Sequence, residues 1–286
     1  MNKRVIPESE LILTDGRIYH LNLRPDQLAD TIIMVGDPDR VAKVSTYFDK
    51  IEHQVSSREL VTHTGYVGGK RLSVVSSGMG TDNVELVMTE LDALVNIDFD
   101  TRTVKDELIS LEIIRIGTSG CLQADIPLDA HLVSEAALGL DTLMSFYNWK
   151  NDEKGAAIVH AVAQQLQLPF APYFADADMG LVNKYGEGMA RGTTITAPGF
   201  YAPQGREVRL KTVNSNFVEM LSKMELPLSR FTNLEMETAG YYAMAHLLGH
   251  KMVSLNALIA NRARQEFSSN HEMAVDGLIR SVLSRL

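Results

Sequence analysis

Short runs of apolar residues, many of them β-branched, recur along the 286-residue chain and are separated by more polar stretches. Runs of this kind, bounded by glycine, proline and charged residues, are typical of buried β-strands. On this basis we predict strands at Thr31 to Val35, Leu60 to Val67, Arg71 to Ser76, Glu112 to Ile116, His131 to Ala136, Thr193 to Thr196, Phe231 to Leu234 and Met252 to Ile259.

Between these runs, apolar residues recur at the spacing of one face of an α-helix. The pattern predicts an amphipathic helix from Thr238 to Leu248. Two further helices are indicated by Val84, Val87, Met88, Leu91 and Val95, and by Val275, Leu278, Ile279, Val282, Leu283 and Leu286. Strands that alternate with helices predict the α/β class, with a largely parallel or mixed sheet covered by helices on both faces.

No linker rich in proline, glycine or serine, change of composition or internal repeat divides the chain, so we predict a single domain over residues 1–286. Hydrophobic residues make up 45% of the sequence, which is enough for a sizeable core. No apolar run approaches the length of a membrane span, so we expect no membrane partner. The segment from Asp98 to Ser110 is unusually polar and is predicted to be a surface insertion.

The net charge is −9, from 27 basic and 36 acidic residues, and no basic stripe offsets it. This balance argues against nucleic acid as a partner. Cys121 is the only cysteine, which excludes an internal disulfide and fits a reducing compartment. Because the stretch from Met1 to Glu8 also lacks an apolar signal core, we expect a cytoplasmic protein.

Two glycine-containing segments with an arginine follow or end apolar runs. The first is Gly36-Asp37-Pro38-Asp39-Arg40, in which glycine lets backbone N–H groups approach a ligand, Pro38 favours the start of a helix and Arg40 supplies a permanent charge. The second is Arg115-Ile116-Gly117-Thr118-Ser119-Gly120. Arg40 could instead cap a helix and Arg115 form a structural ion pair, but two arginines at successive strand ends favour an anion site.

A third segment, Asn233-Leu234-Glu235-Met236-Glu237, places two carboxylates where a strand passes into a helix. One carboxylate there can simply complement the helix dipole. A second one can accept hydrogen bonds from two neighbouring hydroxyls, as in a sugar, and methionine offers an adaptable apolar wall. The pair is therefore expected to include a carboxylate that binds a ligand.

A turn-rich loop carries Phe200, Gln204 and Arg206. Phe200 can stack on a planar ring, Gln204 offers both a donor and an acceptor, and Arg206 can stabilise negative charge on an oxygen. The alternative is an ordinary loop with a core phenylalanine, since Pro198, Gly199, Pro203 and Gly205 all favour turns.

In order and spacing, these segments resemble the nucleoside phosphorylase superfamily, and Phe200-Tyr201-Ala202-Pro203-Gln204-Gly205-Arg206 is most similar to its uridine phosphorylases. The resemblance extends from His20 to the final helix. It implies a central mixed β-sheet, partly barrel-like and flanked by helices on both sides. It also implies a pentosyltransferase that converts uridine and phosphate into uracil and ribose 1-phosphate, without a redox cofactor.

The resemblance also implies roles for individual residues, with Glu235 as a structural carboxylate. A homodimer, assembled further into a hexamer, is implied because His20 and Arg58 match residues that the family donates to a neighbouring subunit. A monovalent cation near Glu59 is left open, since Asn83 replaces a serine ligand. By resemblance, phosphate is bound by Gly36, Arg40, Arg58, Arg115 and Thr118, and ribose by His20, Thr118, Met236 and Glu237. The base is bound by Phe200, Gln204 and Arg206. The catalytic residues are Arg115, Gln204, Arg206 and Arg262.

Some positions depart from the family pattern. Ser57 replaces a histidine, and Thr196-Ala197-Pro198-Gly199 replaces a Ser-Ser-Asp-Thr segment before the base loop. Purine-cleaving relatives carry an aspartate where Asn261 stands, and asparagine cannot protonate a leaving purine. Asn261 and Arg262 could also simply cap a strand end. His246 and His250 are not expected to bind a metal, because Gly249 between them is predicted to end the helix.

Three alternative functions remain. A purine nucleoside phosphorylase is opposed by Gln204, Arg206 and Asn261. A nucleosidase that uses water would have no use for three phosphate arginines. A non-catalytic nucleoside-binding or storage protein on the same fold would be expected to have lost charged site residues, and none is missing here.

Overall fold

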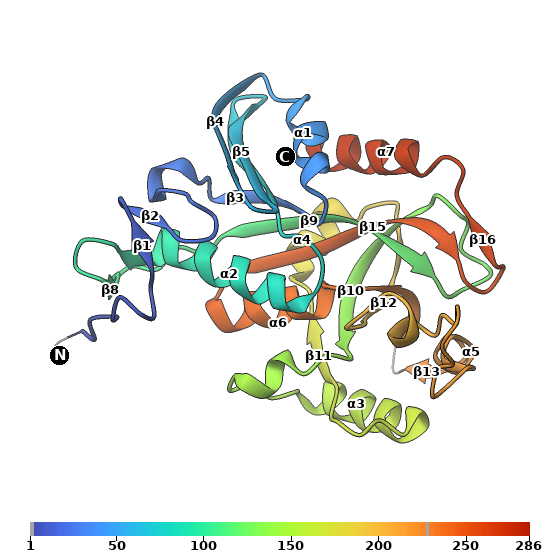
Figure 1. Ribbon diagram of the computed structural model, residues 1–286. Helices are drawn as coiled ribbons and strands as arrows, with labels where there is room; N and C mark the ends of the chain where they lie inside the picture. Colours follow the sequence, from blue (N-terminus) through green and yellow to red (C-terminus); the bar gives the residue numbers. More distant parts are fainter. Residues whose placement is uncertain (1–2, 227–228) are drawn as a thin grey trace.

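A mixed sheet forms the centre of the protein in the computed structural model, which describes residues 3–226 and 229–286 (Figure 1). Within the described residues the sheet has 12 strands. Ten of these strands lie side by side in the order β13 (Glu225–Leu226), β14 (Ser229–Glu235), β12 (Ala190–Thr196), β10 (His131–Gly139), β15 (Lys251–Asn261), β9 (Glu112–Cys121), β3 (Thr31–Val35), β6 (Lys70–Ser76), β5 (Leu60–Val67) and β4 (Lys50–Ser57). The other two are β11 (Tyr173–Asp176), which pairs with β10, and β16 (Glu266–Phe267), which pairs with β15.

Part of the sheet closes into a five-stranded barrel. Strand β14 pairs with β12 on one side and with β9 on the other, where Asn233 lies opposite Cys121 and Leu234 opposite Gly120. The ring therefore runs through β9, β15, β10, β12 and β14. This closure confirms the expected mixed, partly barrel-like sheet.

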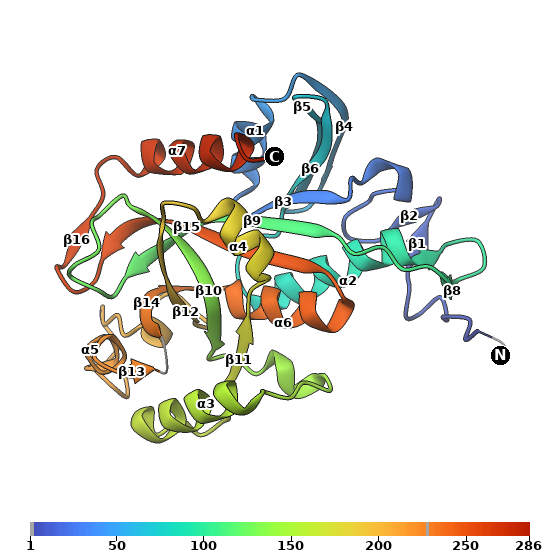
Figure 2. The ribbon, with the colours of Figure 1, turned by 180° about the vertical axis from the view of Figure 1, so that it is seen from behind.

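Helices cover both faces of the sheet, as expected. Helices α1 (Pro38–Ser45) and α7 (His271–Leu283) lie on one side, and α2 (Thr81–Asn96) and α6 (Thr238–Leu248) pack together on the other (Figures 1 and 2). The remaining helices are α3 (Glu153–Leu166), α4 (Met179–Tyr185) and α5 (Phe217–Ser222). None of the helices in the described part of the chain combines the length and apolar character needed to span a membrane.

All eight expected strands are present, and β3, β5 and α6 have the bounds that the pattern predicted. The prediction that a strand ends at Ile116 is wrong. Strand β9 continues through Gly117 and Thr118 to Cys121, because β15 pairs with it along its whole length and β14 pairs with its end. The second glycine segment is thus part of the barrel wall, not a loop.

The polar insertion lies at the surface, as expected. It contains the short hairpin of β7 (Ile97–Asp98) and β8 (Thr103–Val104), near the two-stranded ribbon of β1 (Leu13–Thr14) and β2 (Arg17–Ile18). Arg102 donates to the carbonyl oxygens of Ile6 (2.9 Å), Pro7 (3.2 Å) and Leu11. The insertion therefore fastens the N-terminal segment and lies at the end of the molecule marked by the N-terminus in both views (Figures 1 and 2).

Candidate active site

A cavity of about 1450 Å³ opens where several strands of the sheet end. It lies between the loop after β3, the middle of β9, the junction of β14 with α6, the end of β15 and the loop after β12. The structure thus brings most predicted site residues together at one cavity, whose lining includes Gly36, Arg40, Arg115, Thr118, Phe200, Gln204, Arg206, Met236, Glu237 and Arg262.

One end of the cavity is formed by the loop that joins β3 to α1. Asp37 caps the helix by accepting a hydrogen bond from the N–H of Asp39 at 3.0 Å, and Pro38 is its first residue. Arg40 follows in the first turn and donates to the carbonyl of Ile116 at 3.2 Å. Burial, and next the nearby Arg115, lower the pKa of Arg40. A bound anion would compensate both guanidinium groups.

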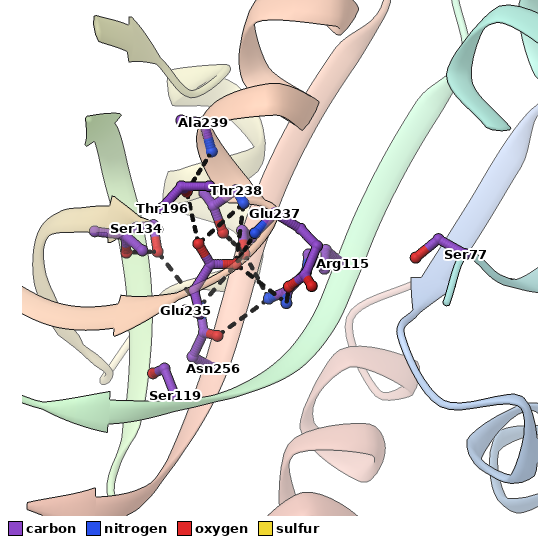
Figure 3. Close-up of polar contacts among 12 residues, drawn as sticks. Ser77, Arg115, Ser119, Ser134, Thr196, Glu235, Glu237, Thr238, Ala239 and Asn256 are labelled. Atoms are coloured by element: carbon purple, nitrogen blue, oxygen red, sulfur yellow. Dashed lines mark hydrogen bonds and ion pairs between the residues drawn. The ribbon is translucent and has the colours of Figure 1, made fainter. Parts of the chain in front are cut away.

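Arg115 lies inside the barrel wall and is only 4% exposed. Its Nη2 is 2.6 Å from Oε2 of Glu237 and 3.1 Å from Oε2 of Glu235. Its Nη1 donates to Oδ1 of Asn256 at 3.1 Å and to Oγ of Ser254 at 3.3 Å (Figure 3). Burial by itself lowers the pKa of Arg115, but the two carboxylates outweigh it and hold the pKa above its usual value. The side chain therefore stays charged although it is buried.

The two carboxylates at the start of α6 have different surroundings. Glu235 accepts from the N–H groups of Glu237 at 3.0 Å and Thr238 at 2.9 Å, and from the hydroxyl of Thr196 at 2.7 Å. Glu237 accepts one backbone hydrogen bond, from Gly80 at 2.9 Å. Burial raises the pKa of Glu237, whereas Arg115 opposes this shift. Glu235 thus holds the helix start, in agreement with its expected structural role, and Glu237 has more free capacity to accept.

The other end of the cavity carries Phe200, Gln204 and Arg206 from the loop after β12. Arg206 donates to Oε1 of Gln204 and to the carbonyl of Phe200, both at 2.6 Å, and its guanidinium lies 3.9 Å from the centre of the Phe200 ring. Arg262 donates to the carbonyl of Gln204 at 3.0 Å. Burial, and then Arg262, lower the pKa of Arg206 to about 10. Within the described residues neither arginine forms an ion pair, so this end can receive negative charge.

Asn261 has its amide committed to the protein backbone. Its Nδ2 donates to the carbonyls of Gln123 at 3.0 Å and Ile126 at 3.2 Å, and its Oδ1 accepts from the N–H of Arg264 at 3.0 Å. Of the two roles considered for this residue, the geometry favours the cap of a strand end. Arg262 beside it contacts the backbone carbonyl of Gln204 instead.

His20 and Arg58 do not line the cavity. Nδ1 of His20 is 2.7 Å from Oε1 of Glu90, and the ring packs against Tyr19 at 4.8 Å between centroids. The guanidinium of Arg58 lies 5.6 Å from the same Tyr19 ring. Both residues therefore meet at Tyr19, outside the chain's own cavity, while Glu59 next to Arg58 lines it.

No group of three or more histidine, cysteine, aspartate or glutamate residues that could hold a metal occurs in the described part of the chain. Gly249 ends α6 in the left-handed conformation (φ 78°), as the sequence predicted. His246 packs against Trp149, whereas Nδ1 of His250 accepts from the N–H of Leu111 at 3.2 Å. The two histidines thus have separate partners.

Three residues that hydrogen-bond to Arg115 or Glu237 were not predicted from the sequence: Gly80, Ser254 and Asn256. Ser254 and Asn256 are polar residues at alternate positions of the apolar run from Met252 to Ile259. Alternate residues of a strand face the same side, so this spacing is the signal that could have identified them as partners of a buried charge. Gly80 contributes only its backbone N–H, which no pattern of side chains reveals.

Comparisons with known proteins identify the family. The family model of the phosphorylase superfamily matches residues 30–284, and the chain belongs to this superfamily. A uridine phosphorylase of Thermococcus kodakarensis is 28% identical over 260 residues, which cover 90% of this chain and 82% of the relative. A DeoD-type purine nucleoside phosphorylase of Chromobacterium violaceum is 27% identical over 273 residues, or 91% of this chain and 98% of the relative.

A solved structure of a Trypanosoma brucei nucleoside phosphorylase, described as showing uridine phosphorylase activity, is also similar. It superposes with a TM-score of 0.89 at 29% sequence identity, and the match covers 96% of this chain and 98% of that one. The fold expected from the sequence resemblance is therefore confirmed.

Proposed function

We propose that the protein is a uridine phosphorylase, which converts uridine and phosphate reversibly into uracil and ribose 1-phosphate. One observation carries the proposal: a single cavity has arginines at one end, a buried carboxylate in the middle, and an amide with two further arginines at the other end. This order matches the phosphate, ribose and uracil that the reaction must align.

At the first end, phosphate binds to Arg40, to the hydroxyl of Thr118 and to backbone groups at Gly36, beside the charge of Arg115. Glu237 accepts from the ribose hydroxyls, and Met236 packs against the sugar. A phosphate oxygen then bonds to C1′ of the ribose as the bond between C1′ and N1 of uracil breaks. Holding both reactants in line lowers the barrier without a covalent intermediate.

At the base end, the electron pair of the broken bond moves onto uracil. Gln204 pairs with N3–H and a neighbouring carbonyl, Phe200 stacks on the ring, and Arg206 and Arg262 stabilise the negative charge on a carbonyl oxygen. Because this charge is stabilised by fixed cations, uracil can leave as an anion and take its proton from water.

Because some relatives cleave purine nucleosides, a purine nucleoside phosphorylase is the second candidate function. A leaving purine benefits from a proton on its ring, and the amide of Asn261 cannot supply one. That amide is also committed to the backbone of Gln123, Ile126 and Arg264. We therefore assign the base end to a pyrimidine. A nucleosidase or a storage protein would have no need of the arginines at the phosphate end.

The proposal extends to assembly and location. His20 and Arg58 lie together outside the chain's own cavity, so they complete the site of a neighbouring subunit in a homodimer, the unit of a hexamer. The enzyme needs phosphate as co-substrate and no organic cofactor. Its single cysteine fits the cytoplasm.

The test is the release of uracil from uridine by the purified protein, with and without inorganic phosphate, and with ribose 1-phosphate measured as the second product. We expect uracil release that depends on phosphate and equal amounts of the two products. Uracil release that continues at the same rate without phosphate, with free ribose as the product, would identify a nucleosidase instead.

A further inference from the structure

The barrel encloses a buried polar network around Arg115. Thr194 donates to Oδ1 of Asn233 at 2.9 Å and its hydroxyl lies 2.5 Å from that of Ser134. Asn256 belongs to the same network, with its Nδ2 at 3.3 Å from the hydroxyl of Ser254. Buried polar groups that have hydrogen-bond partners form a rigid network. This network can therefore hold the charge of Arg115 in a fixed place.

The pairing of β9 with β15 explains how Arg115 reaches this network. In this parallel pair Arg115 lies beside Ser254, and Gly117 lies beside Asn256. Gly117 leaves its position on that face unfilled, and a Cβ atom there would stand 2.0 Å from Nη1 of Arg115. The guanidinium therefore extends over Gly117 and ends against the amide oxygen of Asn256.

The charges on the two sides of the guanidinium differ. Nη2 faces the carboxylates of Glu235 and Glu237, whereas Nη1 faces the neutral oxygens of Asn256 and Ser254. An amide oxygen accepts a hydrogen bond as a carboxylate does, but it adds no negative charge. A third carboxylate at this place would repel an anion bound beside Arg115.

We infer that Asn256 is a positioning residue: it fixes the guanidinium of Arg115 between Glu237 and bound phosphate without adding negative charge to the phosphate site. The inference rests on the proposed function and extends it, because it identifies what sets the affinity for phosphate. Asn256 has no exposed surface and does not line the cavity, so it acts only through Arg115.

The decisive variant is Asn256→Asp, which has nearly the same shape and differs in charge. We expect kcat/KM for phosphate to fall at least about tenfold near neutral pH, which corresponds to about 1.4 kcal/mol. As the pH is lowered, the new carboxyl becomes protonated and part of the loss should be recovered. With phosphate saturating, kcat/KM for uridine should change much less.

Two further variants separate positioning from general damage to the barrel. Asn256→Ala removes the acceptor without adding charge and should weaken phosphate binding severalfold, with no new dependence on pH. Thr194→Val is an isosteric change in the same network with no contact to Arg115, and it should leave the phosphate dependence unchanged. If Asn256→Asp does not fold, Asn256→Ala decides the question. A larger loss of kcat/KM for phosphate than for uridine supports the inference, and equal losses overturn it.

The inference and the proposed function can fail separately. If the wild-type protein cleaves no nucleoside, the proposed function is wrong. The inference is then tested by the rise in Tm that inorganic phosphate produces, which should be smaller in Asn256→Asp than in the wild type. The inference would be overturned if kcat/KM for phosphate in Asn256→Asp equalled the wild-type value at every pH. An equal loss in Thr194→Val would do the same, since the effect would then come from the barrel and not from Arg115.

Discussion

Gly117 determines the place of the most buried charge in the candidate site. It lets strand β9 carry Arg115 without a clash, because the guanidinium lies directly over the glycine. Arg115 in turn joins the carboxylate of Glu237 to the neutral acceptors on β15. A single missing side chain thus sets the arrangement of several groups.

Gly117→Ala should displace the guanidinium of Arg115, since the added methyl group would stand within 2.0 Å of Nη1. We expect the loss of a preorganised donor, on the order of 2 to 4 kcal/mol in transition-state stabilisation, measured as kcat/KM for phosphate. Gly277→Ala is the matched control, because its Cβ would meet only the His131 ring at 3.5 Å. Unchanged phosphate kinetics in Gly117→Ala would contradict the geometry described for Arg115.

At the scale of elements, the start of α6 is held by the side chain of Glu235. Its carboxylate accepts from two backbone N–H groups, one hydroxyl and Arg115. Glu237, two residues later, accepts from Gly80 and Arg115 and from no other group in the described part of the chain. The same residue type therefore has a structural role at one position and a ligand-binding role proposed at the other.

This difference predicts different effects of two matched substitutions. Glu235→Gln places an amide NH₂ against several donors in a buried site and should lower the free energy of unfolding by about 3 kcal/mol. Glu237→Gln keeps an oxygen for Gly80, and Arg115 keeps its ion pair with Glu235, so this change should cost less stability and should raise KM for the nucleoside. Urea denaturation and steady-state kinetics measure the two effects, and equal stability losses would refute the division of roles.

The elements also show where sequence patterns were sufficient. The β-branched run from Thr31 to Val35 and the helical spacing from Thr238 to Leu248 are local signals, and both elements have the predicted bounds. Strand β9 could not be predicted in full, because Gly117 and Gly120 resemble a turn in the sequence. They continue the strand only because β14 and β15, distant in sequence, pair with it.

The candidate site, like the elements, could be predicted where the signal is local and not where it depends on strand pairing. Arg40, Glu237 and Gln204 come from three different segments that could be grouped from the sequence, and all three line one cavity. The alternate spacing of Ser254 and Asn256 indicates a buried polar face, but the contact of Asn256 with Arg115 depends on the register between two strands. Contacts that cross strands carry no local signal in a single sequence.

At the scale of the whole molecule, the positions of His20 and Arg58 predict that active sites are shared between subunits. Mixing an inactive Arg58→Ala protein with an inactive Arg40→Ala protein, after dissociation and reassembly, should restore part of the activity. Mixed dimers would contain one site with both arginines intact. A fully active monomer, observed by ultracentrifugation at assay concentrations, would refute this arrangement.

The central claim is that this cavity cleaves a pyrimidine nucleoside, and the most direct measurement compares kcat/KM for uridine and inosine at saturating phosphate. We expect uridine to exceed inosine by a wide margin, because Gln204 and Arg206 match uracil and Asn261 cannot protonate a purine. Leaving those buried polar groups unpaired costs about 1 to 3 kcal/mol, so Gln204→Ala should narrow the margin. Cleavage of inosine as efficient as that of uridine would contradict the account.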